Sequence, residues 1–204
     1  MAFIHFILDR SGSMEMCLND TIGGFNAFVR EQAPKSTMSL YMFDNSFDIV
    51  YQNKKIKDVE KLTTKTFRPR GGTALLDAIG KTIEHIDSTN QQQWGDIDEV
   101  GNIVVILTDG DENSSVLHTN SDINNLIASR KAQGWKFVFL GANQDAIKSA
   151  SQIGIGREAA IDFDTANMCE VMRSASSALS RCVTGETQDI VFTNEERMSC
   201  SQNI

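Results

Sequence analysis

The chain has 204 residues, 41% hydrophobic and 23% charged, which is the balance of a globular domain with a core. Its 19 basic and 27 acidic residues give a net charge of −8, and such a surface repels phosphate backbones, which argues against nucleic acid as a partner. No stretch approaches the roughly 20 apolar residues of a membrane span, and the short apolar N-terminus lacks the features of a signal peptide. None of the four cysteines forms a C-x-x-C pair, so we expect a cytoplasmic protein with reduced thiols and no cysteine-bound zinc.

Residues 2–8 are a continuous apolar run, which predicts a strand buried on both faces. His5 lies inside this run, and we interpret it as a hydrogen-bonded core residue. After a Ser/Gly loop, apolar side chains recur at helical spacing, and Asn19 or Asp20 is placed to cap that helix. The helical positions are Ile22, Phe25, Phe28 and Val29.

A hairpin is predicted next, because residues 38–43 and 47–51 are short strand-like runs on either side of an Asp-Asn-Ser turn. Residues 54–67 are polar and rich in lysine, which indicates at most a short helix or an extended passage. A Gly-Gly-Thr turn then leads into a second helix, which Thr73 is placed to cap, and residues 88–99 are expected to form a polar loop. The apolar stripe of this helix is Leu75, Ile79, Ile83 and Ile86.

The second half of the chain continues the alternation of strand and helix. Residues 103–107 predict a second fully buried strand, and Ser121 or Asp122 is placed to cap the next helix, which Gly134 ends. The remaining expected elements are a buried strand at 137–140, a short helix at 144–153, an edge strand at 159–163, a helix from Met168 to Val183 and a possible short strand at 190–192.

Buried strands that alternate with helices predict a doubly wound α/β fold, with a mostly parallel central sheet and helices on both faces. The early hairpin adds one antiparallel edge strand. We expect one domain over residues 1–184 and a C-terminal tail over residues 185–204 whose structure the pattern does not define.

Two aspartates follow the strands that we expect at the centre of the sheet. Ligands of doubly wound sheets bind beyond the carboxyl ends of the strands, at the point where strand order reverses, so Asp9 and Asp109 should lie near each other. Two unpaired carboxylates at close range repel and need a cation. Ser11, Ser13 and Thr73 would add hydroxyl oxygens, and an all-oxygen set selects Mg²⁺, Mn²⁺ or Ca²⁺ rather than Zn²⁺.

These residues match a known family motif. Asp9-Arg-Ser11-Gly-Ser13, Thr73 within Gly-Gly-Thr-Ala-Leu and Asp109 within Leu-Thr-Asp-Gly resemble the metal-ion-dependent adhesion site (MIDAS) of von Willebrand factor A (VWA) domains. The resemblance covers residues 2–183 and implies a Rossmann-like fold. It also implies Mg²⁺ bound by the two serines and the threonine, with the aspartates coordinating directly or through water. In many members, the open metal position takes an Asp or Glu side chain from a protein partner.

The resemblance and the oxygen-rich site together predict a metal-dependent protein-binding module that is not an enzyme, because the site offers no general base or activated nucleophile beyond metal-bound waters. The alternative is a regulatory VWA subunit of an intracellular ATP-driven complex of the AAA type. The chain has no Gly-x-x-x-x-Gly-Lys-Ser/Thr motif, so in that case the ATPase would be a separate protein.

Other functional classes fit less well. A phosphotransferase of the haloacid-dehalogenase type needs a second acid where Ser11 stands, and no Gly-x-Ser-x-Gly motif of a serine hydrolase surrounds Ser13. None of the three histidines has an obvious catalytic partner. Residues 154–159 have the letters of a dinucleotide fingerprint, but they follow a helix and precede a strand, so we interpret them as a turn.

Three more acidic residues lie near the motif in sequence. We interpret Asp111 and Glu112 as a solvated acidic loop, and Asp77 as a favourable charge in the first turn of its helix.

Overall fold

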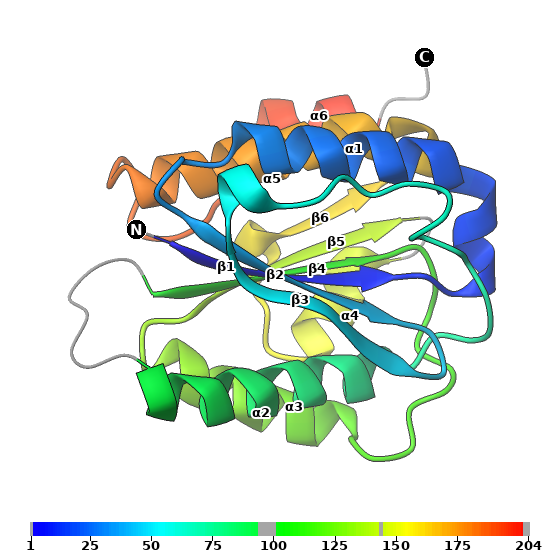
Figure 1. Ribbon diagram of the computed structural model, residues 1–204, viewed down its shortest axis with the longest axis horizontal. Helices are drawn as coiled ribbons and strands as arrows, with labels where there is room; N and C mark the ends of the chain where they lie inside the picture. The colour runs from blue at the N-terminus through cyan, green and yellow to red at the C-terminus, as the bar shows by residue number, and fades with distance from the viewer. Residues whose placement is uncertain (1, 94–100, 143–144, 202–204) are drawn as a thin grey trace.

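The computed structural model describes residues 2–93, 101–142 and 145–201. Its centre is a six-stranded sheet in the order β3-β2-β1-β4-β5-β6 (Figure 1). Strands β2 and β3 pair antiparallel, and all the other neighbours pair parallel. The strands are β1 (Phe3–Asp9), β2 (Thr37–Phe43), β3 (Phe47–Lys55), β4 (Asn102–Thr108), β5 (Lys136–Ala142) and β6 (Ala160–Phe163). The predicted doubly wound α/β fold with one antiparallel edge strand is therefore confirmed.

Strand order reverses between β1 and β4, as predicted. The chain runs outward from β1 through β2 to β3, returns to pair β4 with the other side of β1, and then runs outward to β6. In the register of β1 and β4, Leu8 lies opposite Leu107, so Asp9 and Thr108 end these strands at the same level. Two residues distant in sequence are thereby placed together at the carboxyl edge of the sheet.

Helices cover both faces of the sheet (Figure 1). One layer holds α1 (Leu18–Glu31), α5 (Met168–Val183) and α6 (Asn194–Ser201), and the other holds α2 (Leu75–Gln93), α3 (Asn120–Lys131) and α4 (Ala146–Gln152). Short 3-10 helices are η1 (Gly12–Cys17), η2 (Ile56–Asp58), η3 (Arg157–Ala159) and η4 (Thr165–Asn167). No helix in these parts of the chain is long and apolar enough to cross a bilayer.

The alternation of side chains along β1 divides the core into two. Ile4, Phe6 and Leu8 belong to the cluster that includes α1 and α5, whereas Ile7 belongs to the cluster that includes α2 and α3. Phe6 packs edge-on against Phe25 of α1, with ring centroids 5.2 Å apart. Burial on both faces explains why this strand reads as an unbroken apolar run.

Three predicted helix boundaries are wrong. Helix α1 begins at Leu18, because the chain enters η1 directly after the loop, and Asn19 and Asp20 lie inside the first turn. The cap of α3 is Thr119, whose side chain forms a capping box with Asp122. Helix α2 continues to Gln93, where we expected a polar loop from residue 88, and residues 94–99 of that loop lie outside the described residues.

The described part of the C-terminal tail packs against the domain. Ile190 and Phe192 are buried in the same core as β1 and α5, but they form no strand, so the strand predicted at residues 190–192 is wrong. Arg197 donates from its guanidinium to the carbonyl of Ala160 at 2.7 Å, which ties α6 to β6. The division at residue 184 stays a prediction.

Candidate metal centre

Asp9 is a buried residue at the middle of the candidate centre. It ends β1 with 0% of its surface exposed. Its Oδ1 accepts a hydrogen bond from the backbone N–H of Ser11 at 2.6 Å, and its Oδ2 accepts one from the hydroxyl of Thr108 at 2.6 Å. One carboxylate thus joins the ends of β1 and β4 and shapes the loop that follows β1.

A chain of hydroxyl groups leads from that loop to the second carboxylate. Ser13 donates its hydroxyl hydrogen to Oδ1 of Asp109 at 2.6 Å. The oxygens of Ser11 and Ser13 lie 3.0 Å apart, and since the hydrogen of Ser13 is already used, Ser11 is the donor in that contact. Ser13 is exposed and Asp109 is 9% exposed, so the centre opens to solvent on this side.

Thr73 reaches the same place from a third loop. The N–H of Gly12 donates to the carbonyl of Gly71 at 3.0 Å, and this bond ties the glycine turn to the loop after β1. A Cβ added to Gly110 would lie 3.3 Å from Oγ1 of Thr73 and 3.5 Å from Oγ of Ser13, so both hydroxyls face the backbone beside Asp109. Thr73 is 3% exposed, and its hydroxyl makes no hydrogen bond within the described residues.

All five residues that the sequence singles out therefore lie around the carboxyl ends of β1 and β4. Asp9, Ser11, Ser13 and Asp109 are linked by hydrogen bonds through the loop after β1, and Thr73 stands beside Ser13 and Gly110. Thr108, which donates to the second oxygen of Asp9, was not predicted from the sequence. Its position directly before Asp109, at the end of a buried strand, is the sequence feature that could have predicted this role.

Burial makes both carboxylates costly to ionise. Burial, with a smaller contribution from the charge of Asp109, raises the pKa of Asp9 to about 6, although the hydrogen bonds from Thr108 and Ser11 oppose this. Burial also raises the pKa of Asp109, although the hydroxyl of Ser13 opposes this. A cation between the two aspartates would favour their ionised forms.

The donor set fits a hard divalent cation. It contains only oxygen atoms, which are the ligands that such cations prefer. Gly110 has no Cβ, so the space beside the hydroxyls of Thr73 and Ser13 stays open. In the part of the chain that the structure describes, no group of three or more His, Cys, Asp and Glu side chains could hold a metal ion. A cation in this centre would therefore need the hydroxyl groups as well as the two carboxylates.

A third buried carboxylate supports the loops from behind, a role that was not predicted from the sequence. Asp44, which directly follows β2, accepts from Nε of Arg10 at 2.9 Å and from Nε of Arg70 at 2.7 Å. Burial alone would raise the pKa of Asp44, but the hydrogen bonds from Arg70 and the backbone of Ser46 and the charge of Arg10 lower it overall. Because β2 lies beside β1, its terminal acid joins the same edge of the sheet.

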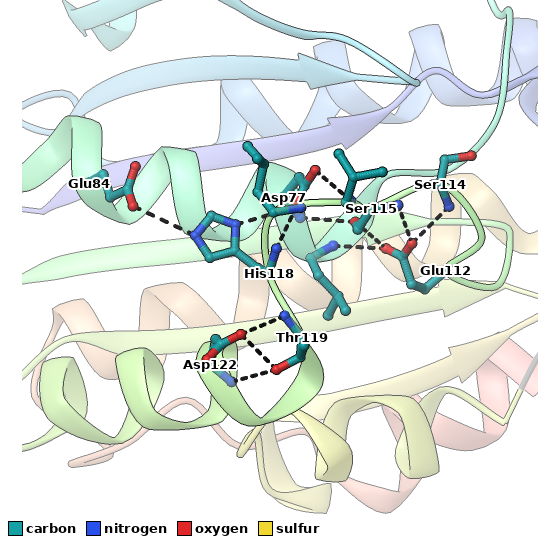
Figure 2. A network of polar contacts seen from close by, with 11 residues as sticks. Asp77, Glu84, Glu112, Ser114, Ser115, His118, Thr119 and Asp122 are labelled. Atoms are coloured by element: carbon teal, nitrogen blue, oxygen red, sulfur yellow. Dashed lines mark hydrogen bonds and ion pairs between the residues drawn. The ribbon is translucent and has the colours of Figure 1, made fainter.

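The start of α2 is capped from the loop after β4, and not by Thr73 as we predicted. Figure 2 shows Glu112 and Ser115 at this point. Glu112 Oε2 accepts from the N–H of Leu76 at 2.9 Å, and the hydroxyl of Ser115 accepts from the N–H of Asp77 at 3.0 Å. The interpretation of Glu112 as a solvated residue is therefore wrong, whereas Asp111 is exposed as expected.

Asp77 holds the rest of that loop, which is more than a favourable helix charge. Its carboxylate accepts from the backbone N–H groups of Val116, Leu117 and His118 at 2.9–3.0 Å. These bonds lower the pKa of Asp77 in spite of its burial. The ring of His118 lies between Asp77 at 3.4 Å and Glu84 at 3.6 Å (Figure 2).

Comparisons with known proteins identify the family and the fold. The family model of the von Willebrand factor type A domain matches residues 4–173. Among curated proteins, no significant match is found.

Solved structures of low sequence identity share the fold. A von Willebrand factor type A protein from Catenulispora acidiphila superposes with a TM-score of 0.64 at 16% identity, over 87% of this chain and 42% of that one. The vWF domain of the pilus tip protein Mfa5 from Porphyromonas gingivalis gives 0.63 at 10% identity, over 89% and 96% of the two chains. Proximal thread matrix protein 1 from the mussel byssus, with a zinc-occupied MIDAS motif, gives 0.59 at 17% identity, over 86% and 44%.

The chain spans less than half the length of the first structures that it matches, and between 10% and 18% identity the likeness shows the fold alone. The family model, in contrast, covers most of the chain, from β1 into α5. With the strand order, the family match shows that the chain belongs to the von Willebrand factor type A domain family.

Proposed function

We propose that this VWA domain is a metal-dependent protein-binding module, with Asp9, Ser11, Ser13, Thr73 and Asp109 as the metal site. VWA domains generally mediate interactions between proteins. The observation that supports a metal is the convergence of two buried carboxylates and three hydroxyls on one exposed edge, with the Thr73 hydroxyl left without a hydrogen bond in the described residues.

The partner is a protein that offers an Asp or Glu side chain. Three of the five ligands are neutral hydroxyls, so the bound cation would keep part of its positive charge and attract an outside carboxylate. The exposure of Ser13 supplies the open side from which that carboxylate can approach. The regulatory role beside a separate ATPase and the lack of enzyme activity stay predictions.

The oxygen-only donor set favours Mg²⁺ or Mn²⁺, with Ca²⁺ as a third candidate. The mussel byssus protein with a zinc-occupied MIDAS motif shows that another protein of this fold accepts Zn²⁺ at such a motif. Zinc therefore belongs in any comparison of metal affinities for this chain.

Calorimetric titration and thermal unfolding test the metal site. We expect Mg²⁺ to bind the wild type and to stabilise it by about 2.7 kcal/mol at a metal concentration of 100 times Kd, because only the folded chain assembles the ligands. Asp109→Ala should lose binding and stay folded. Asp111→Ala removes the same charge two residues away at an exposed position and should keep the metal.

Partner capture with and without EDTA extends the test. The wild type should retain a protein partner only without EDTA, and Asp9→Ala should retain none. The proposal is wrong if the wild type binds none of the four metals at millimolar concentration, or if Asp111→Ala loses the metal as Asp109→Ala does. A co-purified ATPase would favour the regulatory alternative.

A further inference from the structure

The charge of this chain is unevenly distributed. Residues 54–70 contain seven of the 19 basic residues and only two of the 27 acidic residues. A strongly basic segment thus lies in a protein whose net charge is −8. The basic residues of this segment are Lys54, Lys55, Lys57, Lys61, Lys65, Arg68 and Arg70.

This segment leads along α1 to the candidate metal centre. Figure 1 shows the chain leaving η2, running beside α1 and reaching the edge where β1 ends. The side-chain amide of Asn26 in α1 donates to the carbonyl of Leu62 at 2.9 Å and accepts from its N–H at 2.8 Å. At the far end, the N–H of Arg70 donates to the carbonyl of Arg10 at 2.7 Å, inside the loop that holds Asp9 and Ser11.

The basic side chains of the segment point outward because its apolar residues are fixed in the core. Leu62 and Phe67 are buried, and the charged residues between and beside them are exposed. Within the described residues, Lys57, Lys61, Lys65 and Arg68 form no ion pair. We call Arg30 of α1 and these residues, with Arg70, the basic face: Arg30, Lys57, Lys61, Lys65, Arg68 and Arg70.

A cavity of about 290 Å³ lies at one end of the basic face, beside Lys57 and Lys61. Arg70 is at the opposite end of the segment. Val29, Ile56 and Val59 supply apolar walls, and Arg30, Lys57 and Lys61 supply basic ones. Asn26 and Glu60 complete the lining. The cavity can take an apolar side chain from a segment whose neighbouring residues are acidic.

We propose that the basic face binds an acidic segment of the protein partner, with an apolar side chain of that segment in the cavity. This inference rests on the proposed function, in which the same partner gives an Asp or Glu to the metal. Charge complementarity selects the occupant, because Lys57, Lys61, Lys65 and Arg68 form no ion pair within the described part of the chain and the metal also selects carboxylates. A nucleic acid would meet the acidic surface of the rest of the chain and has no apolar side chain for the cavity.

The test uses the full chain and a fluorescein-labelled peptide of aspartate and glutamate with interspersed leucine, followed by fluorescence anisotropy in Mg²⁺ and in EDTA. Lys61→Glu with Lys65→Glu reverses two charges of the basic face. The matched control, Lys81→Glu with Lys148→Glu, makes the same net change on α2 and α4, which cover the other side of the sheet. Thermal unfolding and Mg²⁺ titration of both variants check the fold and the metal site.

We expect the basic-face variant to bind the peptide about tenfold more weakly than the control, which corresponds to about 1.4 kcal/mol. Its Mg²⁺ affinity should equal that of the wild type. Equal peptide affinity in the two double variants would overturn the inference while leaving a metal site that binds Mg²⁺ intact. Tighter binding of a single-stranded oligonucleotide than of the peptide would overturn it as well.

If the wild type binds no Mg²⁺ but the basic-face variant still loses the peptide, the result overturns the proposed metal site and supports the basic face as an acidic-peptide surface. The two failures are therefore distinguishable.

Discussion

At the scale of single residues, β1 contains two buried ionisable groups with opposite effects on stability. Burial lowers the pKa of His5 to about 4, although the hydrogen bond from its Nε2 to Oδ1 of Asn102 opposes this. Its Nδ1 is buried without a hydrogen-bond partner among the described residues. His5 is thus a core residue, as we predicted, but only one of its ring nitrogens is hydrogen-bonded.

His5 should make stability depend on pH between about 4 and 6.5. In the unfolded chain His5 becomes protonated below pH 6.5, whereas in the folded chain it stays neutral down to about pH 4. The contribution of neutral His5 to the free energy of unfolding is therefore complete above pH 6.5 and is lost as the pH falls toward 4. The whole effect is roughly 3 kcal/mol. Urea unfolding of wild type and His5→Gln at several pH values measures it.

Asp9 acts in the opposite direction, because its raised folded pKa favours the folded state at low pH. Its contribution is common to both proteins, so the difference between wild type and His5→Gln isolates the histidine. Parallel pH curves for the two proteins would contradict the prediction.

At the scale of elements, α1 and α5 pack closely at Gly24. A Cβ at this position would lie 2.9 Å from Cγ of Met172 and 3.3 Å from the carbonyl oxygen of Met168. Both methionines are fully buried, so neither can move away easily. Gly23, one residue earlier on α1, is exposed and has nothing within 4 Å of its Cβ position.

The two adjacent glycines therefore predict opposite effects of the same substitution. Gly24→Ala should destabilise the domain by about 1–3 kcal/mol through overpacking against α5. Gly23→Ala should stabilise it by about 0.5–1 kcal/mol, because alanine favours the helix and meets no neighbour. Denaturant midpoints of the two variants measure both effects, and equal shifts would show that α5 does not limit the packing of α1.

At the scale of the whole molecule, the C-terminal segment covers the edge of the sheet. Phe192 donates its N–H to the carbonyl of Glu158 at 2.9 Å, and the guanidinium of Arg181 in α5 forms a bidentate pair with Glu196 in α6. Cys200 is fully buried. The described part of the segment thus extends the core that it joins.

A chain that ends at Gly185 should be clearly less stable than the full chain. It loses the buried side chains of Ile190 and Phe192, each of which contributes roughly 1.5–3 kcal/mol. Urea unfolding of the shortened chain measures the loss. An unchanged free energy of unfolding would instead support the division into a domain over residues 1–184 and a separate tail.

Most of the fold could be predicted from the sequence because buried elements carry strong local patterns. The apolar runs at β1 and β4 are strands that both faces of the sheet bury, and the α2 stripe matches its buried side. The helix starts were less predictable. A cap depends on which hydroxyl or carboxylate reaches the free N–H groups, and for α2 those come from Glu112 and Ser115, more than 30 residues away in the sequence.

The sequence by itself determined the doubly wound sheet and the five candidate metal ligands, because the periodicity of burial and the position of polar residues at strand ends are local properties. Only the tertiary structure decided how those ligands are held. Thr108 and the backbone of Ser11 occupy both oxygens of Asp9, and Asp44 joins two arginines behind the loop. The basic face likewise needed the fold, because the burial of Leu62 and Phe67 in the core and the bond of Leu62 to Asn26 of α1 leave the charged residues of a lysine-rich passage exposed.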